Sequence, residues 1–198
     1  FYNTGYIGNE ERPNIEDYLS SVQMGLWMPL SRAHGKTPRE PWQYGDMALK
    51  EVKKWINFRH RLVPYLYHTA CQSHQSGIPM IRPLVMEYPK DPIAKIQNLS
   101  YMLGDALLIS PGFDRDEYEL YLPEGRWQDI ESKEVYEGMT FVHIENKAFA
   151  DGGTSLRVFQ KEGTSIPLFA QKEVLHVPAQ LWKQEDLEFM TFQKKDVD

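Results

Sequence analysis

Gly77-Ile-Pro-Met-Ile-Arg-Pro-Leu-Val-Met86 is the stretch at which the pattern of the sequence changes. Two prolines within this largely apolar run argue against a helix. Before it, apolar residues recur at helical spacing. After it, short apolar segments bounded by Gly, Pro, Asp or Asn are typical of an antiparallel β-sandwich. Helices followed by strands predict two architectural units with a boundary near residue 78.

The first of two helices predicted ahead of this boundary covers residues 15–25. Asn14 can cap its N-terminus, its apolar residues are spaced for one buried face, and Pro29 cannot continue it. The short apolar run Leu26–Leu30 that follows predicts a brief buried strand.

The second helix is predicted to run from an N-cap at Asp46 to Gly77, where the glycine closes the segment. Pro64 should kink or split this helix near residues 60–64, because proline has no amide hydrogen and clashes with the preceding turn. Residues 31–45, between the two helices, contain two glycines and two prolines and are predicted to be irregular.

Seven segments after the boundary are predicted to be strands. They are residues 106–110, 119–122, 140–144, 156–159, 165–169, 173–177 and 187–192. Pro123-Glu-Gly125 supplies a turn after the second of them, so we expect Trp127 to begin the neighbouring strand of a hairpin. The indole ring of Trp127 is expected in the sandwich core.

The composition excludes several kinds of site and partner. The 198 residues include one cysteine, Cys71, which rules out an internal disulfide and a zinc site of several thiolates; no metal or cofactor is predicted. A net charge of −6 argues against a nucleic-acid partner, and no run of 18 apolar residues predicts a membrane span. No signal peptide is visible in the sequence, a cytoplasmic location is favoured, and we expect the chain to begin inside a longer polypeptide.

The best candidate for sugar chemistry is the irregular segment around His34. Pro29-Leu-Ser-Arg-Ala-His-Gly35 is followed closely by Arg39-Glu-Pro-Trp42. Imidazole and guanidinium groups can donate hydrogen bonds to sugar hydroxyls, and an indole ring can stack on a pyranose face. The alternative is a solvated loop with local ion pairs. No helix-borne His pair, phosphate-binding Gly loop or nucleophile elbow occurs elsewhere.

Seven motifs follow one another along the chain: Pro29-Leu-Ser-Arg-Ala-His-Gly35, Arg39-Glu-Pro-Trp42, Arg61-Leu-Val-Pro-Tyr-Leu-Tyr67, Gly77-Ile-Pro-Met-Ile-Arg-Pro83, Glu87-Tyr-Pro-Lys-Asp-Pro92, Tyr101-Met-Leu-Gly-Asp105 and Tyr121-Leu-Pro-Glu-Gly-Arg-Trp127. In this order they resemble glycoside hydrolase family 31, the retaining α-glucosidase and α-xylosidase group. The resemblance runs from about Phe1 to Leu168.

The resemblance implies the C-terminal part of a (β/α)₈ barrel followed by an antiparallel β-sandwich, that is, an α/β unit and an all-β unit. Residues 1–77 would be the end of the catalytic barrel, residues 78–169 the proximal sandwich and residues 170–198 the start of a distal one. The matching histidine of the family binds hydroxyls of the sugar in the −1 subsite. The expected substrate-binding residues are His34, Arg32, Tyr6, Ile7 and Trp42.

The chain departs from the family pattern in two places. The family usually has Asp-Ile-Gly-Gly-Phe where this chain has Asn3-Thr4-Gly5-Tyr6-Ile7. The nucleophile and acid/base aspartates of the family come from segments N-terminal to that loop. We therefore expect no catalytic residue in this chain, which alone would be inactive. The intact polypeptide would cleave an oligosaccharide or α-glycoside by double displacement, and the remainder of that polypeptide would be the partner of this chain.

Two other functions stay open from the sequence. One is a non-catalytic carbohydrate-binding or structural β-sandwich module with a helical appendage. The other is a degenerate, non-catalytic relative used for subunit contacts, which the altered segment Asn3-Thr4-Gly5-Tyr6-Ile7 favours. The Arg39-Glu-Pro-Trp42 motif beside His34 favours the enzyme, since a detached binding module has no use for a barrel loop.

Overall fold

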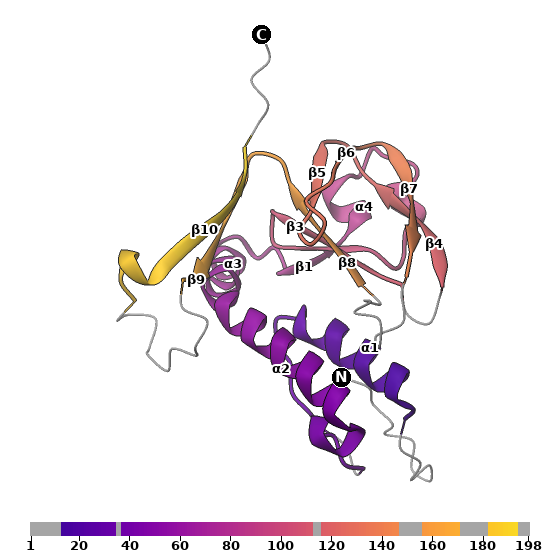
Figure 1. The fold of residues 1–198 in the computed structure, drawn as a ribbon. Helices are drawn as coiled ribbons and strands as arrows, with labels where there is room; N and C mark the ends of the chain where they lie inside the picture. The colour runs from indigo at the N-terminus through magenta and orange to yellow at the C-terminus, as the bar shows by residue number, and fades with distance from the viewer. Residues whose placement is uncertain (1–12, 35–36, 113–115, 147–155, 171–181, 194–198) are drawn as a thin grey trace.

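The computed structural model describes residues 13–34, 37–112, 116–146, 156–170 and 182–193. Within them a group of helices precedes a set of antiparallel strands (Figure 1). The helices are α1 (Ile15–Leu26), α2 (Asp46–Arg61), α3 (Val63–Ser76) and the short α4 (Leu84–Glu87), and the 3-10 turns are η1 (Pro41–Tyr44), η2 (Ala94–Ile96) and η5 (Gln184–Asp186).

Helix α1 begins where the sequence predicts. The side-chain oxygen of Asn14 accepts a hydrogen bond from the backbone N–H of Asp17 at 2.8 Å, which satisfies one of the free amides of the first turn. The buried side chains of Leu19 and Val22 pack against Ala48 and Val52 of α2 in one apolar cluster. The amphipathic spacing of both helices therefore decides how they pair.

The proline-induced break in the long helix is confirmed. Helix α2 ends at Arg61, α3 begins at Val63, and Pro64 occupies the first turn of α3, where its missing N–H has no helical acceptor to lose. Gly77 ends α3 with a left-handed φ of 75°, a conformation that glycine adopts without strain. The expected N-cap is wrong by one residue, because Gly45 is the cap and Asp46 is the first helical residue.

The strand predicted over Leu26–Leu30 is not present. Helix α1 continues to Leu26, and the backbone N–H groups of Trp27 and Met28 donate to the carbonyls of Met24 and Gly25. These donors are used to close the helix, so they cannot form a strand ladder, and Leu30 is 88% exposed.

The antiparallel arrangement predicted after residue 78 is confirmed. One sheet has six strands in the order β1-β2-β3-β8-β5-β6, and two pairs, β4 with β7 and β9 with β10, form separate sheets. The strands are β1 (Ile81–Pro83), β2 (Tyr101–Leu103), β3 (Leu107–Pro111), β4 (Glu117–Leu122), β5 (Arg126–Asp129), β6 (Val135–Glu137), β7 (Thr140–Glu145), β8 (Leu156–Lys161), β9 (Thr164–Phe169) and β10 (Leu187–Phe192). The strand predicted at residues 173–177 lies outside the described residues.

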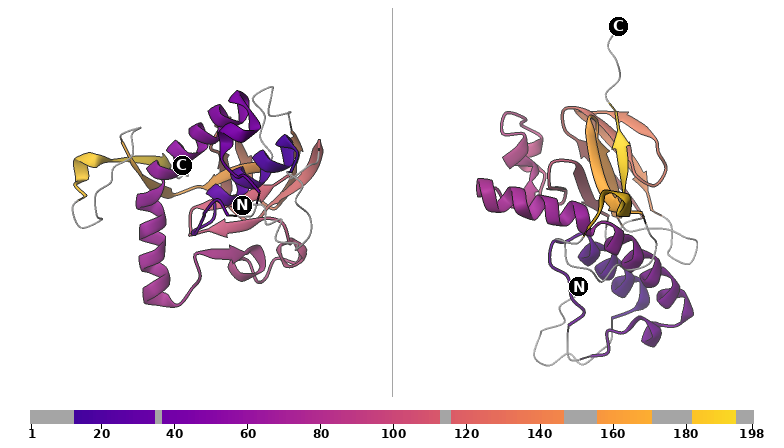
Figure 2. Two further views of the ribbon diagram at one scale, coloured as in Figure 1. Left: turned by 90° about the horizontal axis from the view of Figure 1, so that it is seen from below. Right: turned by 90° about the vertical axis from the view of Figure 1, so that its left-hand side faces the viewer.

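Alternation along β3 creates two cores on the two faces of the large sheet. Leu107 and Ile109 face α3 and join a cluster with Leu62 and Tyr65, whereas Leu108 faces β4 and joins the cluster of the sandwich. All five residues of β3 are buried. Helix α3 therefore covers one face of the sheet and the β4–β7 pair covers the other (Figures 1 and 2).

The hairpin predicted around Pro123–Gly125 is wrong in its pairing. Strand β4 pairs with β7, while β5 pairs with β6 and β8, so the turn leads from one sheet into the other. Trp127 lies in the core as expected, at 0% exposure, and its Nε1–H donates to the carbonyl of Pro123 at 2.8 Å. The end of the stretch Gly77–Met86 begins a short helix, α4, that the sequence does not predict.

On the exposed face of the β4–β7 pair, His143 lies opposite Glu119. His143 Nδ1 is 2.8 Å from Glu119 Oε1, and its Nε2 is 3.7 Å from Glu117 Oε2. The hydrogen bond to Glu119, followed by the charges of Glu119, Glu117 and Glu145, raises the pKa of His143 above its ordinary 6.5. The protonated imidazole therefore stabilises this pair below the pKa of the unfolded chain, and the stabilisation is lost as pH rises through the folded pKa.

We expect a pH titration by NMR, with ¹³C-labelled histidine, to give His143 a pKa above its ordinary 6.5. The variant Glu119→Gln should bring the pKa of His143 down toward 6.5, because it removes the main cause of the shift. An unchanged pKa in that variant would show that the contact with Glu119 is not what raises it.

Candidate functional site

Three of the predicted sugar-binding residues lie on the single connection between α1 and α2. Arg32 and His34 are exposed on the irregular segment that follows α1, and Trp42 lies in η1 with 62% of its surface exposed. Among the described residues, no hydrogen bond or ring contact joins these three side chains to one another. We name residues 30–34 together with residue 37 the His34 loop.

The start of the His34 loop is held by an arginine of α2. The Arg59 guanidinium donates to the carbonyl of Leu26, the last residue of α1, and through its second nitrogen to the carbonyl of Pro29 at 3.0 Å. Burial lowers the pKa of Arg59, although an arginine stays charged at neutral pH. One planar side chain therefore fixes two carbonyls immediately before the loop.

The end of the loop is held by two tyrosines. The Tyr18 hydroxyl of α1 donates to the carbonyl of Arg39 at 2.8 Å, and the Tyr44 hydroxyl donates to the carbonyl of Pro38 at 3.2 Å. The two rings are stacked, with their centroids 3.7 Å apart. Burial raises the pKa of Tyr18 to about 12, so its hydroxyl remains a donor at neutral pH.

The loop presents hydrogen-bond donors and an aromatic ring but holds no pair of carboxylates. Glu40 is the one acidic residue within residues 31–45, and its Oε2 accepts a hydrogen bond from the backbone N–H of Arg39 at 3.0 Å. The exposed imidazole, guanidinium and indole groups are suited to hydroxyl recognition and ring stacking. General acid and nucleophile roles would have to come from other segments.

The remaining predicted site residues, Tyr6 and Ile7, and the segment Asn3–Ile7 lie outside the described residues. Across the residues that the structure describes, no group of three or more His, Cys, Asp or Glu side chains is arranged to hold a metal ion. No described helix has the length and apolar character needed to cross a bilayer.

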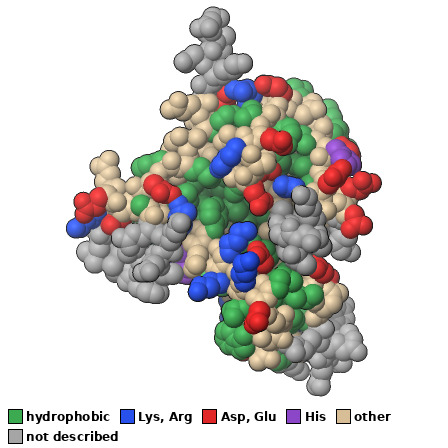
Figure 3. Space-filling model, in the orientation of Figure 1, with side chains coloured by type: hydrophobic (Ala, Val, Ile, Leu, Met, Phe, Trp, Pro, Cys, Tyr) green, Lys and Arg blue, Asp and Glu red, His purple; other side chains and the backbone are tan. Residues whose placement is uncertain are grey.

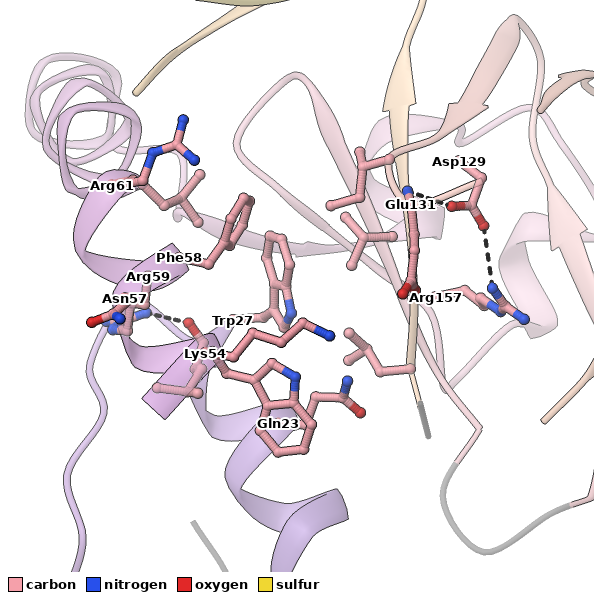
Figure 4. Close-up of a pocket in the computed structure, with 16 residues that line it drawn as sticks. Gln23, Trp27, Lys54, Asn57, Phe58, Arg59, Arg61, Asp129, Glu131 and Arg157 are labelled. Carbon is pink, nitrogen blue, oxygen red and sulfur yellow. Dashed lines mark hydrogen bonds and ion pairs between the residues drawn. The ribbon is translucent and has the colours of Figure 1, made fainter. Parts of the chain in front are cut away.

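A separate hollow of about 460 Å³ lies where α1 and α2 meet the sandwich. Trp27 and Phe58 lie on the helical side and Glu131 and Arg157 on the sandwich side, with Lys54 extending into the space between them (Figure 4). Lys and Arg side chains gather beside apolar surface on this face (Figure 3). Sequence reasoning did not find this hollow, because its two walls come from distant parts of the chain. Arg32, His34 and Trp42 do not line it.

The anchoring residues Tyr18, Tyr44 and Arg59 were also missed. Tyr18 and Arg59 lie within helical stripes, where an aromatic or long side chain is ordinarily assigned to packing. Their contacts to residues 26, 29 and 39 depend on how α1 and α2 are placed, which no local pattern shows. The Arg39-Glu-Pro-Trp42 motif next to Tyr44 was the nearest available signal.

Comparison with known proteins gives matches over most of the chain. The model of the glycosyl hydrolases family 31 TIM-barrel domain matches residues 4–69, and that of the family 31 C-terminal domain matches residues 77–173. The 1,6-α-glucosyltransferase of Sporosarcina globispora is 32% identical over 165 residues, which are 81% of this chain and 13% of that protein. Human neutral α-glucosidase AB is 32% identical over 164 residues, 79% of this chain and 17% of that protein.

Solved structures agree with these sequence matches. A family 31 dextranase of Flavobacterium johnsoniae complexed with glucose has a TM-score of 0.71 at 33% identity, covering 78% of this chain and 19% of that one. The cycloalternan-forming enzyme of Listeria monocytogenes has a TM-score of 0.79 at 27% identity, covering 93% of this chain and 19% of that one. The chain thus spans less than a fifth of the length of these relatives. It belongs to glycoside hydrolase family 31, as the end of a (β/α)₈ barrel followed by the antiparallel β-sandwich that the sequence predicts.

Proposed function

We propose that this chain is the C-terminal part of a retaining α-glycosidase that hydrolyses terminal α-linked glucosides or xylosides. The observation that carries the proposal is the exposed His34 loop, held at both ends, in a chain that matches the barrel domain and then the C-terminal domain of family 31. The relatives named as an α-glucosidase and as a dextranase support an α-glucoside as substrate.

The proposal divides the work between this chain and the remainder of the polypeptide. Retaining hydrolysis needs two carboxyl groups about 5–5.5 Å apart, one as nucleophile and one as acid/base. We assign both to segments outside these 198 residues, so this chain alone is inactive. His34, Arg32 and Trp42, with Tyr6 and Ile7, form one wall of the −1 subsite. Residues 1–77, 78–169 and 170–198 correspond to the barrel end, the proximal sandwich and the start of the distal sandwich.

The test is an assay of the full-length polypeptide on α-glucosides and α-xylosides, with the anomer of the first product followed by ¹H NMR. Double displacement should release the α-anomer before mutarotation, and the 198-residue chain assayed in parallel should give no turnover. Initial release of the β-anomer would exclude the retaining mechanism. Absence of turnover on every α-glycoside tried would exclude the enzyme.

A non-catalytic, sugar-binding relative is the second candidate. The observation in its favour is Asn3 at the position where the family resemblance leads one to expect aspartate. A protein of this kind would bind an α-glucoside without cleaving it. Calorimetric titration with isomaltose, together with the turnover assay, separates the two candidates: heat of binding with no product supports the relative, and product supports the enzyme.

A further inference from the structure

We propose that Arg59 and Tyr18 are positioning residues that set the orientation of the His34 loop from its two ends. This inference rests on the proposed function, since it assigns the loop to substrate binding. Arg59 holds the carbonyls of Leu26 and Pro29 at the start of the loop, and Tyr18 holds the carbonyl of Arg39 after its end. Neither residue is assigned to sugar contact.

The contacts of Arg59 differ from those of an ordinary structural ion pair. Within the described part of the chain, no carboxylate lies within ion-pair distance of its guanidinium, which is half-buried and bonds to neutral carbonyls only. Removing a charge from water without a counter-charge is unfavourable, and burial accordingly lowers the pKa of Arg59. The guanidinium instead donates to two carbonyls at the start of the loop, and an apolar side chain there would leave both of them without these donors.

A guanidinium is the group that this contact requires. Its two terminal nitrogens point in fixed directions from one plane, so it reaches the carbonyls of Leu26 and Pro29 together (Figure 4 shows the bond to Leu26). A lysine ammonium is a single point on a flexible stem and would hold one carbonyl at a time. The spacing between these two carbonyls is therefore fixed by Arg59.

Arg61, two residues along the same helix, supplies an internal comparison. Its guanidinium donates to the carbonyl of Phe169 at 3.0 Å and pairs with Glu188, both in the β9–β10 ribbon. The two arginines lie near the same end of α2 and both bond to backbone carbonyls. They differ in what they hold, because Arg59 fixes the approach to the His34 loop and Arg61 fixes the sandwich.

Tyr18 holds the other end with a single hydroxyl. Its ring is stacked on Tyr44, whose own hydroxyl bonds to Pro38. The variant Tyr18→Phe therefore deletes the bond to Arg39 and keeps the stacked pair. Between the anchors, Arg32 and His34 extend into solvent, so their placement follows from where the loop begins and ends. A binding group displaced by about 1 Å can lower an enzyme rate by about 10²-fold.

The experiment compares Arg59→Met, Arg59→Lys, Tyr18→Phe and Arg61→Met in the full-length polypeptide. We expect Arg59→Met to lower kcat/KM on an α-glucoside roughly tenfold or more, and Arg59→Lys to restore only part of the loss. Tyr18→Phe should lower kcat/KM several-fold. Arg61→Met should lower the melting temperature and leave kcat/KM of the folded protein within about twofold of wild type.

A double-mutant cycle with His34→Ala separates positioning from a general structural effect. If Arg59 acts through the loop, Arg59→Met should lower kcat/KM no further in the His34→Ala background, although it still lowers the melting temperature. An equal loss in both backgrounds, or a loss no larger than that of Arg61→Met, would overturn the proposal. If His34→Ala itself has no effect, the sugar-binding assignment fails instead.

Hydrogen exchange tests the anchors without turnover. Peptides covering residues 26–40 should exchange faster in Arg59→Met and in Tyr18→Phe than in wild type, and Arg61→Met should leave them unchanged. Unchanged exchange in both anchor variants would overturn the proposal whatever the activity of the protein. Faster exchange with unchanged kcat/KM in an active enzyme would also overturn it, because the loop would then be free of any role in substrate placement.

Discussion

His34→Ala should lower kcat/KM of the full-length polypeptide by a factor of roughly thirty to one thousand, which corresponds to about 2–4 kcal/mol of transition-state stabilisation. In the proposed function the exposed imidazole of His34 bonds with sugar hydroxyls, and such bonds strengthen as the sugar distorts during reaction. When the imidazole is removed, polar groups of the bound sugar lose this hydrogen-bond partner. Initial rates on 4-nitrophenyl α-glucoside and on isomaltose would measure the change.

His74→Ala is the matched control for this variant. His74 is also exposed, but it lies in the last turn of α3, away from the connection that carries His34. We expect its kcat/KM to equal that of wild type. The pH dependence of kcat should keep its shape in His34→Ala, because His34 is assigned to binding and not to proton transfer. Near wild-type kcat/KM for His34→Ala on every α-glycoside that the protein cleaves would defeat the assignment.

Trp127→Ala should destabilise the sandwich by about 3–5 kcal/mol, the usual cost of deleting a large buried aromatic side chain. The ring of Trp127 is 0% exposed and packs in a cluster with Leu108, Leu122 and Phe159. Its removal leaves a cavity and also leaves the carbonyl of Pro123 without its donor. The melting temperature and the soluble yield should fall, while KM of the folded fraction stays close to that of wild type.

Two further variants show how much of the stability lost in Trp127→Ala comes from the hydrogen bond and how much from burial of the ring. Trp127→Phe keeps a ring and removes the Nε1–H, so the loss of stability should be nearer about 1–2 kcal/mol. Phe141→Ala removes an aromatic ring that is 49% exposed on the adjoining sheet, and it should cost about 1 kcal/mol or less. Unchanged stability of Trp127→Ala, with KM raised several-fold, would show that Trp127 binds sugar and that its buried position is incidental.

The helices could be predicted because the signals that define them are local. Asn14 caps α1 through a bond to a residue three positions away, and Pro64 and Gly77 act on the turns in which they lie. The short helix α4 is not predicted, because the prolines around it favour extended chain. Pro83 is the N-cap of α4 and has an extended backbone, so it lies outside the helix and removes no hydrogen bond from it.

The pairing of the strands could not be predicted from the sequence. A turn signal at Pro123–Gly125 favours a hairpin, but β5 pairs with β6 and β8, and its Trp127 packs in one cluster with Phe159 of β8. Partner choice among strands depends on which distant apolar faces meet, and burial outweighs a local turn. In the candidate site, too, local features could be predicted and features that depend on tertiary placement could not. His34 was found from its motif, whereas Tyr18 and Arg59 became recognisable only from the placement of two helices.

The break between α2 and α3 makes the sandwich part of the mechanical support of the barrel end. Helix α2 packs on α1, and α3 continues directly into the apolar face of the large sheet through Tyr65 and Leu66. The two units are therefore connected by two successive helices and not by a flexible linker. At the junction of these helices, Arg61 donates a hydrogen bond to the carbonyl of Phe169 in β9. A recombination that exchanged the sandwich at residue 78 would therefore need a new sheet with an apolar face that fits Tyr65 and Leu66.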